Sequence, residues 1–265
     1  MNFSIVIDQF WPLLISGISL GLIYVLISLG YTMVYGVLRL INFANSEIFM
    51  VGTFMTVFVE TGLTNHTLRT QPLHGFQLFW TLLLALVLSM LASGVTAVVV
   101  ELVAYRRLRA RGTNRLASLI SAIGASIVLS ESARILSHSR PQASPRLLEK
   151  VSLGTFYGAN IRIDTVIVIV VSILMFFTLD QFVNRSRLGK AIRATSMSEE
   201  NTKLMGVNLN RVISLTFLIG GLMTGAASFF YMTVYENTNA YVGFNFGLAA
   251  FTAAVLRSEE HTSEL

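Results

Sequence analysis

The sequence predicts an all-α fold, a polytopic transmembrane helix bundle with about six to seven spans present. Hydrophobic residues make up 54% of the 265 residues, charged residues only 12%, and the mean hydropathy is +0.67. Soluble domains of this length do not have such a composition. Spanning a bilayer takes about 20 mostly apolar residues, and several stretches qualify. In chain order they are Phe10–Tyr35, Ile48–Val59 with its flanks, Phe79–Ala104, Leu116–Ile135, Ile163–Phe182 and Val212–Val234, followed by the shorter Phe244–Leu256.

Charge placement predicts how these spans are oriented. One basic cluster follows the third span and another follows the fifth: Arg106, Arg107, Arg109, Arg111 and Arg115, then Arg185, Arg187, Lys190 and Arg193. Both clusters are expected on the cytoplasmic side, with the N-terminus outside unless a broken helix within Tyr31–Val59 reverses the count. The loop Ser137–Lys150 is basic and falls outside, against the rule. Because the charge gathers beside spans, the net +5 indicates membrane lipid rather than nucleic acid as the partner.

The C-terminal residues 257–265, RSEEHTSEL, do not fit the pattern before them. The apolar segment stops abruptly at Leu256, short of a full span, and the nine-residue string resembles the translation of a sequencing-library adapter. We therefore expect a non-native tail at 257–265 and further spans missing after Leu256. A genuine polar C-terminus is the alternative.

The most informative segment is 184–211, NRSRLGKAIRATSMSEENTKLMGVNLNR, a polar, helix-forming stretch between two apolar spans. Ser198 is expected to be an N-cap, with Glu200 in the first turn of a short helix and Gly206 at its C′ position. Docking onto a water-soluble partner at the membrane face explains such a helix. An amphipathic helix lying in the lipid interface explains it equally well.

A second candidate is INFANSE, Ile41–Glu47, which precedes an apolar run. A carboxylate at membrane depth must face a cavity, face a partner or be protonated. Asn42 and Asn45 can bond freed backbone groups or a polar solute. The alternative is a cytoplasmic turn between spans, with Glu47 in water.

Other patterns indicate packing rather than chemistry. Small-residue spacing predicts close helix approach at Gly17, Gly21, Gly30, Gly36, Gly220, Gly221 and Gly225. In ELVAYRRLR, Glu101 is expected to form a structural pair with a neighbouring arginine. The sequence has no P-loop, G-x-S-x-G or HExxH motif, and its histidines lack metal-ligand spacing. It therefore predicts no enzyme, no cofactor and no metal site.

Taken in order, six strings resemble a known family: GYTMVYGVLRLINFANSE, ELVAYRRLR, LISAIGASIVL, SRLGKAIRA, LMGVNLNRVISLTFLIG and AAFTAAVL. Over about Phe10 to Leu256 the chain is similar to the inner-membrane permease of bacterial ABC importers for branched-chain amino acids, the LivH-type subunit. The resemblance implies a permease domain over residues 1–256 and a cytoplasmic coupling loop over 184–211 that docks on an ATPase. In that loop it singles out Arg187, Gly189, Arg193, Ala194, Glu200 and Gly206.

The same resemblance matches INFANSE to a motif usually written N-F-A-H-G-E. Asn42, Phe43, Ala44 and Glu47 match and become substrate-pathway candidates, whereas Asn45 and Ser46 depart from the pattern and leave the solute open. The implied assembly is a second homologous permease subunit, two ATPase subunits that bind the ATP, and an extracytoplasmic solute-binding protein at the bacterial inner membrane. Alternatives are a permease for urea or short amides, a partner-free channel or secondary transporter that uses Glu47, and a non-transporting membrane scaffold.

Overall fold

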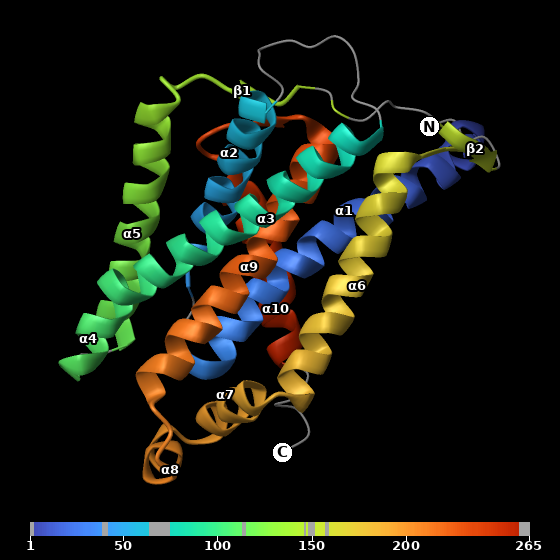
Figure 1. The fold of residues 1–265 in the computed structure, drawn as a ribbon. Helices are drawn as coiled ribbons and strands as arrows, with labels where there is room; N and C mark the ends of the chain where they lie inside the picture. Colours follow the sequence, from blue (N-terminus) through green and yellow to red (C-terminus); the bar gives the residue numbers. More distant parts are fainter. Residues whose placement is uncertain are drawn as a thin grey trace.

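Helices form almost all of the computed structural model, which describes residues 3–38, 42–63, 75–112, 115–145, 147, 152–156 and 159–259. Ten α-helices and one π-helix, η1, follow one another in that part of the chain (Figure 1). They are α1 (Phe3–Leu38), α2 (Asn45–Leu63), α3 (Gly75–Val100), η1 (Glu101–Arg106), α4 (Arg107–Ala110), α5 (Arg115–Leu136), α6 (Ile163–Arg185), α7 (Arg187–Met197), α8 (Glu199–Leu204), α9 (Leu209–Tyr235) and α10 (Val242–Glu259). Six of the helical stretches are long and apolar enough to cross a membrane, and Val242–Ala253 is a shorter apolar helix. The predicted fold class is confirmed.

The two ends of the bundle differ. Helices α4, α7 and α8 lie at one end, which we call the basic end, and the N-terminal part of α1 lies at the other, the strand end (Figure 1). Both predicted basic clusters therefore share one end, as the charge pattern requires. Four short strands that the sequence did not predict pair antiparallel as β1 (Gln142–Ala143) with β4 (Asn237–Thr238) and β2 (Ser152–Phe156) with β3 (Ala159–Arg162).

Helix α9 is the centre of the packing. It contacts α1, α2 and α3. Of the residues in its most apolar stretch, 72% are buried, which is the largest share among the six spans of the described chain. Gly221 and Gly225 allow this approach: a Cβ on Gly221 would lie 2.7 Å from the Ala97 Cβ, and one on Gly225 would lie 2.7 Å from the Ser89 carbonyl oxygen. This confirms the small-residue prediction for α9.

Serine hydroxyls bind the same helices together. Ser89 Oγ donates to the Gly225 carbonyl at 2.9 Å, and Ser93 Oγ donates to the Ile48 carbonyl at 3.0 Å, linking α3 to α9 and to α2. Buried hydroxyls need such partners, because water is absent from the interior of a span. No described residue packs on Gly17, Gly21 or Gly36, since an added Cβ there would have nothing within 4 Å, so close helix approach at these three positions stays a prediction.

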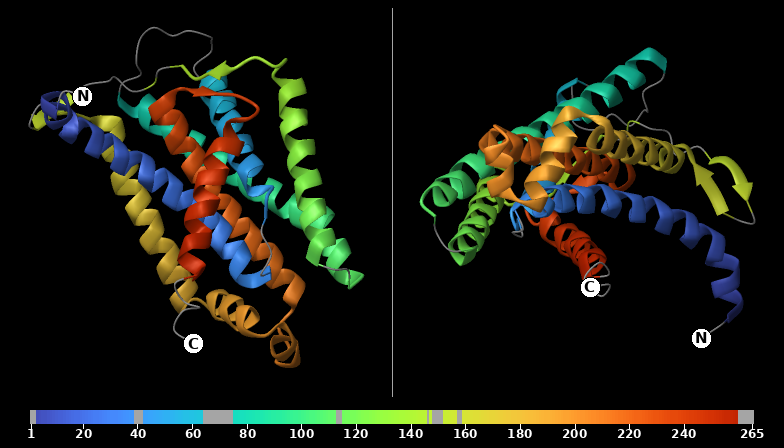
Figure 2. Two further views of the ribbon diagram at one scale, coloured as in Figure 1. Left: turned by 180° about the vertical axis from the view of Figure 1, so that it is seen from behind. Right: turned by 90° about the horizontal axis from the view of Figure 1, so that it is seen from below.

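Helices α5 and α10 flank this centre. Helix α5 contacts only α2, η1 and α4 to any extent among the described elements, and 11% of its apolar window is buried. Helix α10 packs on α1 and α2, and Figure 2 (left) shows it in front of α1 while α5 stands at the edge of the bundle. Residues 257–259 continue α10, whereas 260–265 lie outside the described residues, so the interpretation of 257–265 as a tail stays a prediction.

Candidate functional site

The predicted pathway segment forms the turn that begins α2. Asn42 Oδ1 accepts hydrogen bonds at 3.2 Å from the Ala44 backbone N–H and at 3.2 Å from the Tyr105 hydroxyl of η1. Ser46 Oγ donates to the Phe43 carbonyl at 2.8 Å. An asparagine that bonds the backbone two residues on is a turn-forming arrangement. Asn42 and Ala44 are both buried, so this turn is part of the packed interior.

Glu47 lies inside the bundle, not at its edge. Its side chain is only 3% exposed, and Oε1 accepts a hydrogen bond from Ser126 Oγ on α5 at 3.2 Å. Within the described chain, Oε2 has no hydrogen-bond partner. Ser126 lies near the midpoint of α5, about 15 Å along the helix from either end. Glu47 is therefore near mid-depth, and the alternative of a cytoplasmic turn with Glu47 in water is wrong.

The pathway candidates do not converge on one pocket. Phe43 faces α10, where its ring centroid is 5.9 Å from that of Phe251. Asn45 faces α9, with Oδ1 3.4 Å from Thr224 Oγ1, and so lies away from Glu47. Residues two apart on a helix point to nearly opposite sides, which explains the separation. Of this segment, Glu47 alone combines a charge, burial and an oxygen that no described residue bonds.

The predicted coupling loop begins with a tight corner between α6 and α7. Ser186 caps α7 by accepting from the Gly189 N–H at 2.8 Å. Gly189 is buried, and a Cβ there would overlap the Val183 carbonyl, so the corner requires glycine. Arg193 Nη1 donates to Asn184 Oδ1 at 2.7 Å, which fastens α7 to the end of α6. Gly189 and Arg193 therefore hold the loop in shape.

The second half of the loop confirms the predicted capping. Ser198 accepts from the Asn201 N–H at 3.2 Å as the N-cap of α8, and Gly206 has φ +77°, as a C′ residue should. Because Ser198 has extended backbone (φ −155°, ψ 114°), the segment forms two short helices, not one continuous rod. Five of the six predicted loop residues are exposed: Arg187, Arg193, Ala194, Glu200 and Gly206.

Three large apolar residues that the sequence reasoning did not single out are strongly exposed in this loop. Met197, Leu204 and Met205, which we call the apolar tip, are 84%, 83% and 84% exposed. Exposed apolar clusters rimmed by polar residues mark protein or membrane contacts. The sequence could have indicated this surface, because these three residues interrupt a largely polar stretch. They add the contact surface that the predicted polar residues lack.

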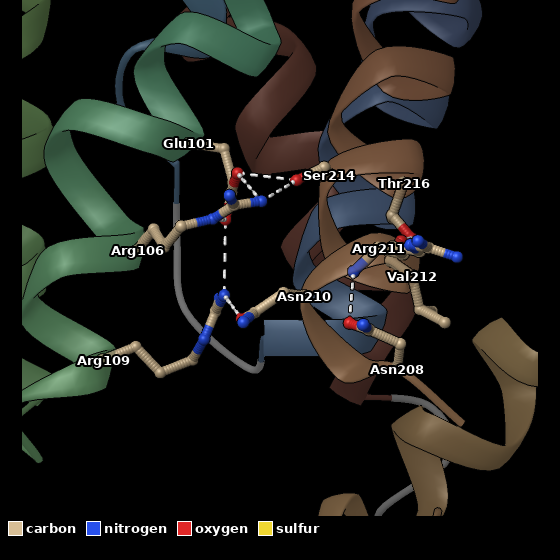
Figure 3. A network of polar contacts seen from close by, with 9 residues as sticks. All are labelled: Glu101, Arg106, Arg109, Asn208, Asn210, Arg211, Val212, Ser214 and Thr216. Carbon is tan, nitrogen blue, oxygen red and sulfur yellow. Dashed lines mark hydrogen bonds and ion pairs between the residues drawn. The ribbon is translucent and has the colours of Figure 1, made fainter. Parts of the chain in front are cut away.

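A buried carboxylate fastens η1 to the start of α9 (Figure 3). Glu101 is 0% exposed, pairs with Arg106 at 3.4 Å and with Arg109 at 3.3 Å, and accepts from Ser214 Oγ at 2.8 Å. Arg109 also donates to Asn210 Oδ1 at 2.8 Å. The i→i+5 repeat of the π-helix suits a pair five residues apart, Glu101 and Arg106. The predicted pairing of Glu101 is confirmed.

Replacing Glu101 with glutamine should destabilise the protein by about 2–3 kcal/mol, since the two arginines lose their shared buried counterion but stay partly hydrated. In detergent we expect the Tm to fall by about 6–12 °C. Asp180→Asn is the control, because the contact of Asp180 with Asn184 is exposed and its loss should change Tm by no more than about 2 °C. Equal shifts in the two variants would contradict the assigned role of Glu101.

Known proteins resemble this chain over nearly its whole length. The family described as "Branched-chain amino acid transport system / permease component" matches residues 13–256. The permease protein BraD of Pseudomonas aeruginosa, named for high-affinity branched-chain amino acid transport, is 38% identical over 246 residues, which are 92% of this chain and 77% of the relative. LivH of Escherichia coli is 36% identical, and LivH of Salmonella typhimurium 35% identical, each over 245 residues (91% of this chain, 76% of the relative). No solved structure matches.

The family match, these identities and the six apolar helices agree with one another. They identify a multi-pass protein of the bacterial inner membrane. The chain belongs to the family of branched-chain amino acid transport system permease components.

Proposed function

We propose that this chain is the membrane-spanning subunit of an ATP-driven importer for branched-chain amino acids. Relatives at 35–38% identity are named as permease proteins of high-affinity branched-chain amino acid transport systems, and the chain contains two features that such a subunit needs. One is a shaped contact surface at the basic end; the other is a polar group inside the bundle. The assembly would comprise this subunit, a second homologous permease, two ATPase subunits and an extracytoplasmic solute-binding protein.

The apolar tip is the observation that carries the proposal. Met197, Leu204 and Met205 stand out from two capped helices at the end where the basic clusters gather. Glu200 is exposed beside them. A soluble ATPase subunit would bury these side chains and complete the interface with a polar rim. ATP would be bound and hydrolysed by that partner, and this chain would supply no catalytic group.

The apolar tip is mechanically coupled to the bundle through the short link between α8 and α9. The last residue of α8 is Leu204 and the first of α9 is Leu209, so the link between the two helices is short. Helix α9 contacts α1, α2 and α3, and Glu101 ties its first turns to η1. A movement of α7 and α8 would therefore shift packed helices as a unit, as rigid-body transitions do.

The buried carboxylate favours an amino acid over urea as the solute. Glu47 Oε2 is buried and unbonded within the described residues, and we infer that the carboxyl group is ionised when it receives an ammonium ion. Urea and short amides are neutral and would gain little from it. We assign Glu47 to the substrate pathway, with Asn42, Phe43 and Ala44 shaping the turn that positions it.

Uptake by the assembled transporter in proteoliposomes tests this function. With ATP inside and binding protein outside, labelled leucine should accumulate, and excess valine or isoleucine should suppress its uptake while urea should not. Uptake that persists without the ATPase subunits would favour the partner-free channel or secondary transporter. Accumulation of urea in place of leucine would favour the amide permease.

A further inference from the structure

The least buried span carries a line of polar side chains, in which Ser130 Oγ donates to the Ile127 carbonyl of its own helix at 3.1 Å. Ser126, Ser130 and Arg134 follow one another on α5 at four-residue intervals, and Glu131 lies beside the last of them. Such spacing places them along one flank of the helix, over about 12 Å. Polar and charged groups within spans usually face a partner, a cavity or a solute route.

At the strand end of this flank stands a charged pair. Arg134 Nη2 is 2.6 Å from Glu131 Oε2, and the two side chains are 44% and 41% exposed. The Tyr241 hydroxyl, in the turn just before α10, donates to Glu131 Oε1 at 3.3 Å and so connects that turn to α5. An exposed ion pair three residues apart contributes little to stability. Stabilisation of α5 therefore does not account for the Arg134–Glu131 pair.

At mid-depth the same flank meets Glu47. Ser126 Oγ bonds Glu47 Oε1, while the buried Oε2 has no partner among the described residues. On the other side of Glu47, α10 packs on Ser46, where a Cβ on Gly247 would lie 3.0 Å from the Ser46 Cα. The start of α2 therefore lies between α5 and α10, and the hydrogen bond from Tyr241 to Glu131 joins α5 to the turn before α10. Ile127, which is 57% exposed, adds apolar surface to the same flank.

We propose that this flank of α5 borders the solute route and that Glu131 and Arg134 form an outer recognition site for a zwitterionic α-amino acid. Arg134 receives the carboxylate and Glu131 the ammonium group; the ammonium then moves to Glu47, which bonds Ser126 about 7–8 Å deeper along α5. Ile127 contacts the branched apolar side chain on the way. This inference rests on the proposed import of amino acids and adds to it the residues that select a molecule with both charges.

Charge removal tests the outer site in the assembled transporter, with leucine-loaded binding protein at saturation. Glu131→Gln and Arg134→Gln should each lower leucine uptake about tenfold or more, because each removes one charged hydrogen-bond partner. The ATP hydrolysis stimulated by binding protein should stay within about twofold of the unaltered rate, since the coupling surface is intact. Ser132→Ala, whose hydroxyl only bonds the Val128 carbonyl, is the control for α5 and should keep both rates.

This split between uptake and hydrolysis separates a solute site from a structural role. If both rates fall together, or if neither falls, Glu131 and Arg134 do not recognise the solute and the inference is overturned. If the unaltered assembly carries no leucine at all, the proposed function fails, and the inference fails with it. An unaltered assembly that carries leucine beside variants with normal uptake overturns the inference alone.

The absence of cysteine from the sequence permits a second test, which holds even if the charge variants assemble poorly. A hydrophilic thiol reagent should label Ser130→Cys in the assembled transporter, and leucine-loaded binding protein should slow that labelling. Val128→Cys lies at nearly the same depth but on the opposite flank, is 64% exposed in this subunit, and should react at least about tenfold more slowly if it faces lipid. Equal labelling of both positions, or none at Ser130→Cys, would show that the flank does not border a water-filled route.

Discussion

Changing Leu204 and Met205 together to glutamate should abolish ATP-driven uptake while leaving the subunit folded. Both side chains are more than 80% exposed, so the change costs the isolated subunit little. If the ATPase buries them, each contributes about 2 kcal/mol or more, and losing both weakens the contact by a factor of several hundred. Co-purification of the ATPase with the tagged permease, followed by its Tm in detergent, measures both parts of this expectation.

Two matched variants separate the loss of apolar contact from the effect of added negative charge. Leu204→Gln with Met205→Gln removes the apolar contact without adding charge and should also prevent co-purification. Lys203→Glu changes the local charge by the same two units as the glutamate pair, on an exposed neighbour, and should retain substantially more ATPase. If the glutamate pair binds the ATPase normally but the subunit partitions less strongly into lipid vesicles, the tip lies in the membrane interface, and the docking role is refuted.

Gly221→Leu should prevent the subunit from folding. A Cβ there would lie 2.7 Å from the Ser93 carbonyl oxygen and 2.8 Å from the Gly94 Cα. Those atoms belong to the backbone of α3 and cannot turn aside as a side chain can. Overpacking of this kind typically costs about 1–3 kcal/mol, and more where the backbone must separate. We expect no monodisperse peak on size-exclusion chromatography in detergent.

Gly17→Leu is the matched control for this substitution. An added Cβ at Gly17 has nothing within 4 Å among the described residues, and leucine favours a helix by about 1 kcal/mol over glycine. The isolated subunit should therefore keep or slightly raise its Tm. A folded Gly221→Leu variant, or an equally damaged Gly17→Leu variant, would contradict the assigned packing of α9 on α3.

Local rules were sufficient for part of this architecture. Hydropathy predicted the spans, and the capping preferences of Ser198 and Gly206 predicted both ends of α8 because a cap depends on a few adjacent residues. The same glycine spacing occurs at Gly17–Gly21 and at Gly221–Gly225, yet among the described residues only the second pair packs. Small-residue spacing allows close helix packing, but it does not indicate whether a neighbouring helix packs there.

The candidate site was harder to predict, because its partners are distant in the chain. Glu47 and Ser126 are 79 residues apart, and nothing in INFANSE indicates which span would meet it. The opposite directions of Asn45 and Glu47 follow from helix geometry once α2 is known to begin at Asn45. That boundary was uncertain in the sequence. The exposure of the apolar tip likewise depends on a fold that turns it away from the bundle.

The loose attachment of α5 gives this subunit a division into two parts. Helices α1, α2, α3 and α9 form a block held by glycine contacts and serine hydrogen bonds between backbones, and such a block resists bending. Helix α5 meets it chiefly at α2, where a single long hydrogen bond joins Ser126 to Glu47. Beside such a stiff block, a displacement of α5 as a rigid body disrupts fewer contacts than bending of the block would. That displacement breaks the hydrogen bond between Ser126 and Glu47.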